Sequence, residues 1–266
     1  MQDKGSHETT SVTRDSLKVK ANMKIKDIVQ DPKCHLTIAI EGPDRIGKQT
    51  QVQMLTRTLS SRVGWEQSAY IETPIRDEHT HTRIYEMLRD GRAKKYPSTF
   101  QGLQIANRLI YQAQYLPTFL TRYDALVFDR WNASSYAYGR AAGLSAEELC
   151  CELDLVAEPD ITIILDGPPF PKSDLDDYEK DMEFQSRVRN TYEEWARARP
   201  KGERVYIIDA GDTIEAVHAT IWDIVTDFIP TLYNNVVDMQ KWKVKHAGGA
   251  RIKNVTRPNN NGPNAS

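Results

Sequence analysis

Five short runs of apolar, often β-branched residues recur along the chain, and each is typical of a buried strand in a parallel sheet. The runs are residues 35–40, 68–72, 125–128, 161–165 and 205–208. Apolar residues at helical spacing between them predict a helix ending near residue 62 and helices at 83–88, 100–120, 134–143, 145–156, 178–199 and 213–229. Strands that alternate with helices in this way predict an α/β fold. We expect a five-stranded parallel sheet covered by helices on both faces, with its ligand at the carboxyl ends of the strands.

The two ends of the chain follow other patterns. The first sixteen residues are polar, and residues 17–26 then alternate apolar side chains with mostly lysines, which predicts a half-buried edge strand. Lysines on one face of a strand are typical of a solvated edge strand. The alternative interpretation is a surface that binds an anionic partner. After residue 230 the chain is basic and rich in Asn, and we expect it to be partly disordered. We therefore divide the chain into an N-terminal extension (1–33), an α/β domain (34–230) and a C-terminal extension (231–266).

Charge is unevenly distributed along the chain. A net charge of −2 over 266 residues indicates neither nucleic-acid nor membrane binding by the core, but the extensions carry +2 and +5 and leave −9 on residues 34–230. The basic extensions allow a weaker hypothesis, an accessory role in nucleic-acid binding. The cysteines Cys34, Cys150 and Cys151 are too few for a disulfide framework and favour a reducing, cytoplasmic setting. We expect no signal peptide and no membrane span.

The stretch from Glu41 to Thr50 carries the clearest chemistry. It reads Glu-Gly-Pro-Asp-Arg-Ile-Gly-Lys-Gln-Thr and lies between the first predicted strand and the first predicted helix. This is the context of a phosphate-binding loop, in which Gly42 and Gly47 let backbone N–H groups surround the phosphates and Lys48 adds a positive charge. The loop therefore predicts the three-layer sandwich of the P-loop NTPases.

One position of this loop departs from the usual pattern. The residue after the lysine is normally Ser or Thr, whose hydroxyl holds Mg²⁺, whereas this chain has Gln49 and places Thr50 one residue later. Either the amide oxygen of Gln49 reaches the metal or its waters, or the nucleotide holds the metal mainly by itself. A loop that binds nucleotide but does little chemistry is the alternative.

Several arginines are expected near the same end of the sheet. They are Arg45, Arg76, Arg108 and Arg130. Guanidinium groups match phosphate oxygens in pairs, so four of them at one end predict a clamp for an anionic substrate. Asp44 and Asp129 lie among them and can bind a sugar hydroxyl or metal-bound water, or hold the arginines in place. Phosphoryl transfer needs this mixture, because fixed positive charge and positioning stabilise its transition state.

These motifs together resemble the thymidylate kinases, which phosphorylate dTMP to dTDP with MgATP. The resemblance covers about residues 35–229. The Gly-x-Asp-Arg-x-Gly-Lys form of the loop is similar to that of members whose catalytic arginine lies in the phosphate loop. It implies that Arg45 bridges the phosphates during transfer and that Asp44 contacts the 3′-hydroxyl of the acceptor. The loop residues that would hold ATP are Gly42, Arg45, Ile46, Gly47, Lys48, Gln49 and Thr50.

Further motifs extend the resemblance to the acceptor. Thr73-Pro74-Ile75-Arg76 is similar to the family's Phe-Pro-x-Arg segment, and Asp129-Arg130-Trp131 stands where Asp-Arg-Tyr is usual. They imply that Arg76 and Arg130 bind the acceptor phosphate and that Asp129 is the carboxylate near metal and phosphate. The catalytic set is then Lys48, Arg45 and Asp129, with Gln49 and Asp129 at the metal. The remaining residues assigned by resemblance are Ser134, Ser135 and Tyr138 near the base, Tyr178 against the deoxyribose, and Asp209 and Gly211 in the adenine loop.

Two further departures concern the acceptor base and the lid. On the long helix the family has Phe-x-Ala-Asn-Arg, with the ring stacked on thymine and the arginine bonded to its edge. This chain has Gln104-Ile105-Ala106-Asn107-Arg108, so it keeps the arginine but not the stacking ring. Gln104 is therefore a candidate reader of a modified or different pyrimidine, and Trp131 and Tyr138 are candidates for a replacement stack. The lid at 166–178 is short, rich in proline and without arginine.

The sequence thus predicts an ATP-dependent deoxynucleoside monophosphate kinase, most simply for dTMP, with direct in-line transfer of the γ-phosphoryl group. A deoxynucleoside kinase is the alternative enzyme, and it needs a carboxylate base near the end of the second strand, for which Glu72 is the candidate. A nucleotide-binding regulatory protein without turnover is the third hypothesis, favoured by Gln49, Gln104 and the short lid. The resemblance also implies a homodimer.

Overall fold

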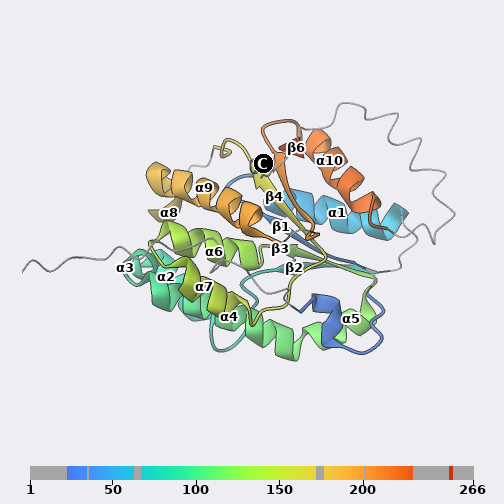
Figure 1. The fold of residues 1–266 in the computed structure, drawn as a ribbon, viewed down its shortest axis with the longest axis horizontal. Helices are drawn as coiled ribbons and strands as arrows, with labels where there is room; N and C mark the ends of the chain where they lie inside the picture. Colours follow the sequence, from blue (N-terminus) through green and yellow to red (C-terminus); the bar gives the residue numbers. More distant parts are fainter. Residues whose placement is uncertain are drawn as a thin grey trace, which may run out of the picture.

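A computed structural model describes residues 23–34, 36–62, 67–171, 177–200, 202–229 and 252–253 of the chain. Its strands are β1 (Leu36–Glu41), β2 (Ser68–Glu72), β3 (Ala125–Asp129), β4 (Ile161–Asp166), β5 (Val205–Asp209) and β6 (Ile252–Lys253). They form one sheet in the order β2-β3-β1-β4-β5-β6 (Figure 1). The first five strands pair in parallel, which confirms the predicted sheet, and the two-residue β6 adds an antiparallel edge.

Helices connect the strands close to where helical spacing predicts them. They are α1 (Lys48–Arg62), α2 (His81–Arg89), α3 (Arg92–Lys95), α4 (Pro97–Gln114), α5 (Leu116–Arg122), α6 (Asn132–Ala141), α7 (Ala146–Leu153), α8 (Asp177–Lys180), α9 (Met182–Ala198) and α10 (Ile214–Thr226). The single helix expected over 100–120 is divided at Tyr115. Pro117 explains the division, because it lacks the N–H that would bond to the preceding turn.

Two apolar cores lie on the two faces of the sheet, because side chains alternate along each strand. Ile38 and Ile40 of β1 pack with Leu55 of α1 and Ile221 of α10, and all four side chains are fully buried. Ala39, between the two isoleucines, belongs to the opposite core. Figure 1 shows α1 and α10 over one face and α4, α6 and α7 over the other. The three-layer arrangement follows directly from this alternation.

The predicted edge strand at 17–26 is wrong in its described part, and residues 17–22 lie outside the described residues. Lys24 makes a single parallel bridge with Glu158, and Ile25–Ile28 form a short 3-10 helix. Ile25 is fully buried, and its N–H donates to the carbonyl oxygen of Glu158 at 2.9 Å. Burial of this isoleucine in the core bends the chain into a turn, so the alternating pattern does not continue as a strand.

Parallel pairing brings the polar residues that end the strands to one edge of the sheet. Asp129 of β3 lies in register with Glu72 of β2 and with Ile40 of β1, one residue before Glu41. Asp166 of β4 lies in register with Asp209 of β5. The loops that follow these residues therefore meet where a ligand is expected.

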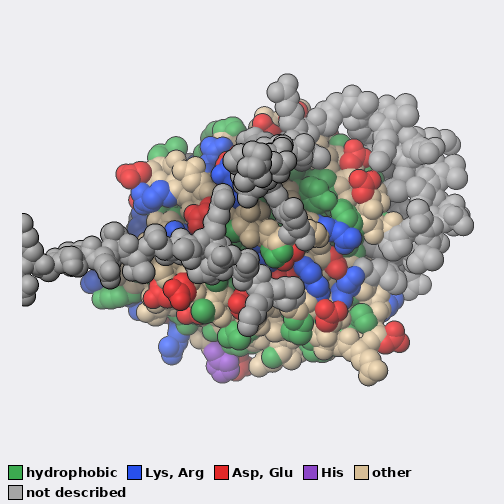
Figure 2. Space-filling model, viewed as in Figure 1, with side chains coloured by type: hydrophobic (Ala, Val, Ile, Leu, Met, Phe, Trp, Pro, Cys, Tyr) green, Lys and Arg blue, Asp and Glu red, His purple; other side chains and the backbone are tan. Residues whose placement is uncertain are grey.

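The surface shows no single dominant feature on the face drawn in Figure 2, where acidic and basic side chains of the described residues are intermixed. None of the helices in the described part of the chain has the length and hydropathy needed to cross a membrane.

Candidate active site at the carboxyl edge of the sheet

The loop between β1 and α1 has the backbone of a phosphate cradle. Gly42 and Gly47 have φ angles of 137° and 84°, and Arg45 has a φ angle of 59°. A side chain at Gly42 would collide with the carbonyl oxygen of Leu165, so glycine is required where the loop lies against β4. The loop leads into the N-terminus of α1, whose first N–H groups lack partners within the helix and favour an anion.

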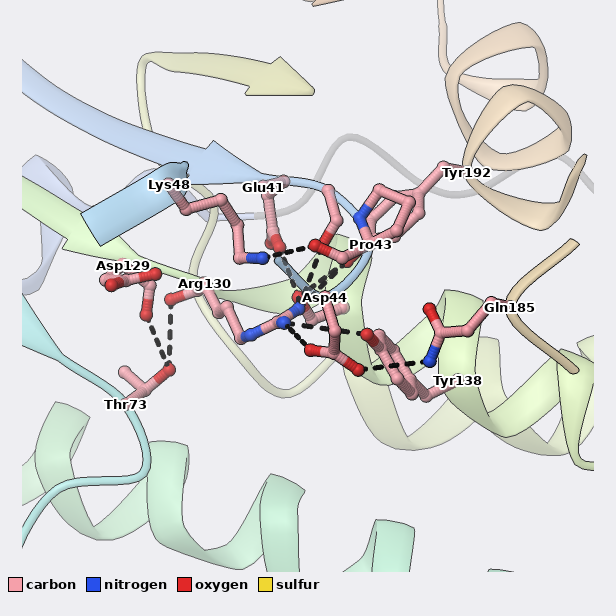
Figure 3. Close-up of polar contacts among 12 residues, drawn as sticks. Glu41, Pro43, Asp44, Lys48, Thr73, Asp129, Arg130, Tyr138, Gln185 and Tyr192 are labelled. Atoms are coloured by element: carbon pink, nitrogen blue, oxygen red, sulfur yellow. Dashed lines mark hydrogen bonds and ion pairs between the residues drawn. The ribbon is translucent and has the colours of Figure 1, made fainter. Parts of the chain in front are cut away.

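The ammonium group of Lys48 lies inside this loop. It is 7% exposed and donates a hydrogen bond to the carbonyl oxygen of Pro43 (Figure 3). Burial, together with the charge of Arg130, lowers the pKa of Lys48 to about 7. A polyphosphate in the loop would bring the negative charge that this lysine needs to stay protonated.

Arg130 joins the phosphate loop to the helix that follows β3. Its guanidinium group donates to the carbonyl oxygen of Gly42 at 3.0 Å, to Oγ of Ser134 at 3.1 Å and to the carboxylate of Asp44 (Figure 3). It also lies 5.3 Å from the ring centre of Tyr138. Burial opposes ionisation of Asp44, but the nearby Arg130 and Lys48 outweigh it and hold the pKa of Asp44 below its usual value. Two expected acceptor residues, Asp44 and Arg130, are thus a charged pair.

A buried carboxylate supports this pair from behind. Glu41 is fully buried, accepts a hydrogen bond from the N–H of Trp131 at 2.7 Å and accepts another from Oγ of Ser134. The hydroxyl of Tyr192 lies 2.8 Å from the same Oγ and donates to the carbonyl oxygen of Gly42 at 3.1 Å. Burial raises the pKa of Glu41. The sequence analysis missed Glu41 and Tyr192, although a charged residue ending an otherwise apolar strand is a usable signal for the former.

A cavity of about 200 Å³ opens beside Arg130, between α2, α4 and α6. Seven residues expected to bind the acceptor line it, namely Asp44, Gln104, Arg108, Arg130, Ser134, Ser135 and Tyr138. Six residues that were not expected complete its wall, namely Thr73, Pro74, Tyr85, Leu88, Phe100 and Gln101. Tyr178 lies in α8, but its side chain is outside the described residues, so its role stays a prediction.

Three residues of this wall have buried polar atoms without a partner among the described residues. They are Oε1 of Gln101, Nε of Arg108 and Oγ of Ser135. Arg108 is 3% exposed, its Nη1 donates to the carbonyl oxygen of Gln104 at 2.9 Å, and burial lowers its pKa to about 10. An unpaired buried polar group costs about 1–3 kcal/mol, so the cavity is suited to a ligand with a hydrogen-bonding edge.

Phe100 is one of two aromatic residues, with Tyr85, that the sequence analysis missed on this wall. It lies four residues before Gln104 in α4, one turn away on the same helix face, and it is 4% exposed. Trp131, a candidate for the replacement stack, is fully buried and donates from its indole nitrogen to the carbonyl oxygen of Ala157 at 2.8 Å. It does not line the cavity. Phe100, Tyr138 and Tyr85 are therefore the rings that line the cavity and are available to a base.

Arg76 lies apart from the acceptor cavity. It is exposed and lines a neighbouring cavity that shares Pro74 and Tyr85 with the first one. Asn107, fully buried on α4, holds the segment by accepting from the N–H of Ile75 at 2.8 Å and donating to its carbonyl oxygen at 3.0 Å. The binding of acceptor phosphate by Arg76 stays a prediction.

The side chain of Arg45 points towards the lid and not into the phosphate loop. Its guanidinium donates to the carbonyl oxygens of Phe170 at 3.2 Å and Glu179 at 3.4 Å, while the N–H of Phe170 donates back to the carbonyl oxygen of Arg45 at 2.7 Å. Nε of Arg45 is buried without a partner among the described residues. The two ends of the lid are therefore tied to the phosphate loop through this arginine.

A second cavity, of about 210 Å³, lies on the other side of the phosphate loop. It is lined by Ile46, Gly47, Thr50, Gln51, Phe170, Ala210, Asp212, Ile214 and Val217. The carboxylate of Asp209 accepts from the N–H of Gly211 at 3.0 Å and fixes the loop that carries Ala210 and Asp212. A largely apolar slot beside a phosphate cradle suits the base of the donor nucleotide.

Asp129, one of the two residues expected to hold a metal, accepts a hydrogen bond on its carboxylate from the Tyr70 hydroxyl at 3.2 Å. Gln49, the other, is the exposed second residue of α1. Carboxylate and amide oxygens are ligands that Mg²⁺ accepts, usually with waters and substrate phosphates, so this donor set fits the ion. The described residues contain no group of three or more His, Cys, Asp or Glu side chains that could hold a metal alone.

These features together define a P-loop kinase of small phosphorylated substrates. A phosphate loop follows the first strand of a parallel sheet, a cavity suited to the donor base lies on one side of this loop, and an acceptor cavity lined by arginines lies on its other side. A sequence model of the thymidylate kinase family matches residues 40–221. The thymidylate kinase of Thiobacillus denitrificans is 30% identical over 206 residues, which are 71% of this chain and 96% of that protein. That of Schizosaccharomyces pombe is 28% identical over 196 residues, which are 71% of this chain and 91% of that protein.

Solved structures agree with these sequence relatives. The thymidylate kinase of Candida albicans matches with a TM-score of 0.59 at 25% identity, covering 73% of this chain and 92% of that one. The thymidylate kinase of Ehrlichia chaffeensis has the same fold, with a TM-score of 0.54 at 24% identity, covering 71% of this chain and 98% of that one. The chain belongs to the thymidylate kinase family. It is accordingly a phosphotransferase that uses ATP to phosphorylate dTMP.

Proposed function

We propose that the residues described above carry out this transfer with Mg²⁺, on dTMP or on a closely related pyrimidine deoxynucleoside monophosphate. The observation that carries the proposal is the position of Arg130, which pairs with Asp44 of the phosphate loop and lines the acceptor cavity. A guanidinium between the two substrates can hold the acceptor phosphate against the donor while its other contacts keep it in place.

The proposed roles follow from the elements that carry the residues. Lys48 and the loop N–H groups hold the phosphates of ATP. Arg45 leaves its lid carbonyls to stabilise charge on the transferring group, and Arg130 and Arg76 hold the acceptor phosphate. Asp44 receives the 3′-hydroxyl of the acceptor, and Tyr178 packs on its deoxyribose. Gln49 and Asp129 hold Mg²⁺, which when bound neutralises charge on the phosphate oxygens.

The range of acceptor bases is part of the proposal. Gln104 stands where the family carries the stacking ring, and Phe100 with Tyr138 offers aromatic surface nearby. Arg108, Ser135 and Gln101 offer polar groups to the edge of a base. The structure of the Candida albicans relative is described as revealing the origin of a broad substrate specificity. We infer that this chain accepts dTMP and also tolerates 5-substituted deoxyuridine monophosphates, because the Gln104 amide can face a polar substituent.

The test is an ADP-release assay with MgATP and dTMP, dUMP, dCMP, dGMP, a 5-substituted dUMP or thymidine. Turnover with dTMP and with the 5-substituted nucleotide is expected. Turnover with dTMP alone would contradict the base range but keep the kinase, and turnover with thymidine alone would contradict the acceptor assignment. An Arg45→Ala variant serves as the control for background hydrolysis.

The two alternatives have less support. Glu72, the carboxylate that a deoxynucleoside kinase would need, is exposed and lines the cavity of Arg76 instead of the acceptor cavity. A regulatory protein without turnover does not need Asp44, Arg130 and Glu41 held in one hydrogen-bonded network that runs through Ser134. Steady ADP formation that depends on added dNMP separates the kinase from a regulatory protein.

Oligomeric state and cellular setting complete the proposal. We propose a homodimer on the basis of family membership, and multi-angle light scattering of the full chain tests it. The three cysteines Cys34, Cys150 and Cys151 are all free, which supports a reducing cytoplasm. The roles of both extensions stay predictions, since most of their residues lie outside the described part of the chain.

A further inference from the structure

Gln101 is a buried amide on the wall of the acceptor cavity. It lies in the second turn of α4 and is 3% exposed. Its Oε1 is buried and has no hydrogen-bond partner among the described residues. A buried amide oxygen without a partner costs free energy, whereas an apolar side chain of similar size would fill the same space without that cost. The packing of α4 therefore does not explain a glutamine at this position.

Two further residues of α4 make Gln101 part of a polar stripe. Gln104 and Arg108 follow it by three and seven residues, which is the spacing of one helix face, and both line the same cavity. Nη1 of Arg108 donates to the carbonyl oxygen of Gln104 at 2.9 Å, so these two residues are also joined. Amide groups carry no net charge, and they suit the edge of a base better than a phosphate.

The stem of Gln101 lies close to α6. A methyl group at Gly139 would lie 3.3 Å from Cγ of Gln101, so the two helices approach closely where α6 has no side chain. Ser135 is four residues before Gly139, one turn away on the same face of α6, and it lines the acceptor cavity. Its Oγ is also buried without a partner within the described part of the chain. Two hydrogen-bonding side chains thus lie along one seam between α4 and α6.

The donors and acceptors of this wall match the edge of a uracil-type base. Such a base presents one N–H group, at N3, between the carbonyl oxygens O2 and O4. An amide oxygen such as Oε1 of Gln101 can only accept, the Nε–H of Arg108 can only donate, and the hydroxyl of Ser135 can do either. One acceptor together with two donors is the complement of that edge.

We propose that Gln101 is a specificity-determining residue for the acceptor base, and that its Oε1 accepts a hydrogen bond from N3–H of thymine. The inference deepens the proposed function and rests on it, because it concerns the base of the same acceptor. The last torsion of a glutamine side chain has a broad energy profile, so the amide can turn towards a ligand at little cost. Arg108 and Ser135 then donate to the carbonyl oxygens that flank N3.

The test measures the binding of dTMP and of 3-deaza-dTMP to the full chain by calorimetry. The analogue has the shape of dTMP but carries C–H in place of N3–H, so it lacks this one hydrogen bond. We expect the parent chain to bind dTMP about tenfold more tightly than the analogue, because the analogue leaves a buried acceptor without its donor. Gln101→Met, which has a similar size and helix propensity, should reduce this preference to less than about twofold.

The affinity for the analogue separates recognition from packing. If Gln101 reads N3–H, Gln101→Met weakens the binding of dTMP and leaves that of the analogue within about twofold. A purely structural role predicts that both ligands are weakened equally. Gln114→Met, at the exposed end of the same helix, is the matched control and should keep the full preference of the parent chain.

Three outcomes overturn the inference. They are equal binding of the two ligands by the parent chain, an equal loss for both ligands in Gln101→Met, and a Gln101→Met variant that keeps the full preference, which would assign N3–H to Ser135. The first outcome needs no variant, so the inference can fail even if Gln101→Met does not fold. Failure of the proposed function is a separate result, because a parent chain that binds dTMP without dNMP-dependent ADP formation still shows or lacks this preference.

Discussion

Arg130 and Asp44 form an ion pair across the boundary between the phosphate loop and the acceptor cavity. The side chain of Arg130 is 21% exposed and that of Asp44 is 24% exposed, so both remain open to the cavity while most of their surface is covered. Each residue thus holds the other at the position where an acceptor nucleotide would lie. The pair ties the backbone of the loop to the helix that carries Ser134 and Tyr138.

Arg130→Lys keeps the charge but loses the planar fork that reaches Gly42, Ser134 and Asp44 at once. We expect kcat/KM for dTMP to fall by about 10²–10³-fold, the range seen when one donor to the transition state is removed. The KM for ATP should change by less than about threefold, since Arg130 does not line the donor cavity. Steady-state kinetics with each substrate varied provides the measurement. An equal loss for both substrates would contradict the acceptor role.

The lowered pKa of Lys48 leads us to expect proton uptake when ATP binds. Its pKa in the free protein is lowered to about 7, chiefly by burial, so the group is mostly neutral at pH 8.5. Phosphates in the loop favour the charged form and raise this pKa, so the complex takes up a proton between about pH 7 and pH 10. Calorimetry at pH 8.5 in two buffers of different ionisation enthalpy should give different apparent enthalpies. Lys48→Met should abolish the difference, and a buffer-independent enthalpy in the parent chain would refute the prediction.

The buried hydrogen bonds of Glu41 lead us to expect that its substitution lowers the stability of the fold, independently of substrate binding. Glu41→Ala removes the acceptor of two buried donors, the N–H of Trp131 and the hydroxyl of Ser134. Each unsatisfied donor costs about 1–3 kcal/mol, so the free energy of unfolding should fall by roughly 3 kcal/mol. Glu41→Gln keeps one acceptor oxygen and should cost about 1 kcal/mol. Urea denaturation measures both changes, with Glu215→Ala on exposed α10 surface as the control. Equal values for the two Glu41 variants would show that the hydrogen bonds are not the cause.

We expect the ring of Phe100 to strengthen the binding of the acceptor nucleotide. Phe100→Leu keeps most of the buried volume but removes the aromatic face, and base–aromatic stacking contributes about 1–3 kcal/mol. We expect the KM for dTMP to rise about tenfold with kcat within about threefold, as for a group that binds ground state and transition state alike. Gln104→Phe, which restores the family's ring, should recover part of the loss. A Phe100→Leu variant with unchanged KM would place the base away from Phe100.

The acceptor site shows which of its residues could be predicted from the sequence and which could not. Asp44, Arg108, Arg130 and Ser135 were expected to meet, and they line one cavity, because strand order and helix periodicity determine which residues reach the carboxyl edge. The stack was assigned to Trp131 or Tyr138 in the absence of a ring at position 104. Trp131 instead lies fully buried in the core, and Phe100, which follows from the four-residue spacing, was overlooked.

The sequence by itself determined the α/β class, the five parallel strands and the phosphate loop, since each depends on local periodicity or on glycines at set positions. Only the tertiary structure decided that Glu41 supports Arg130 and that Arg45 reaches the lid. It alone also showed that the Tyr70 hydroxyl donates to Asp129. These contacts join residues from different elements, and their side-chain directions depend on packing and burial that no local pattern records.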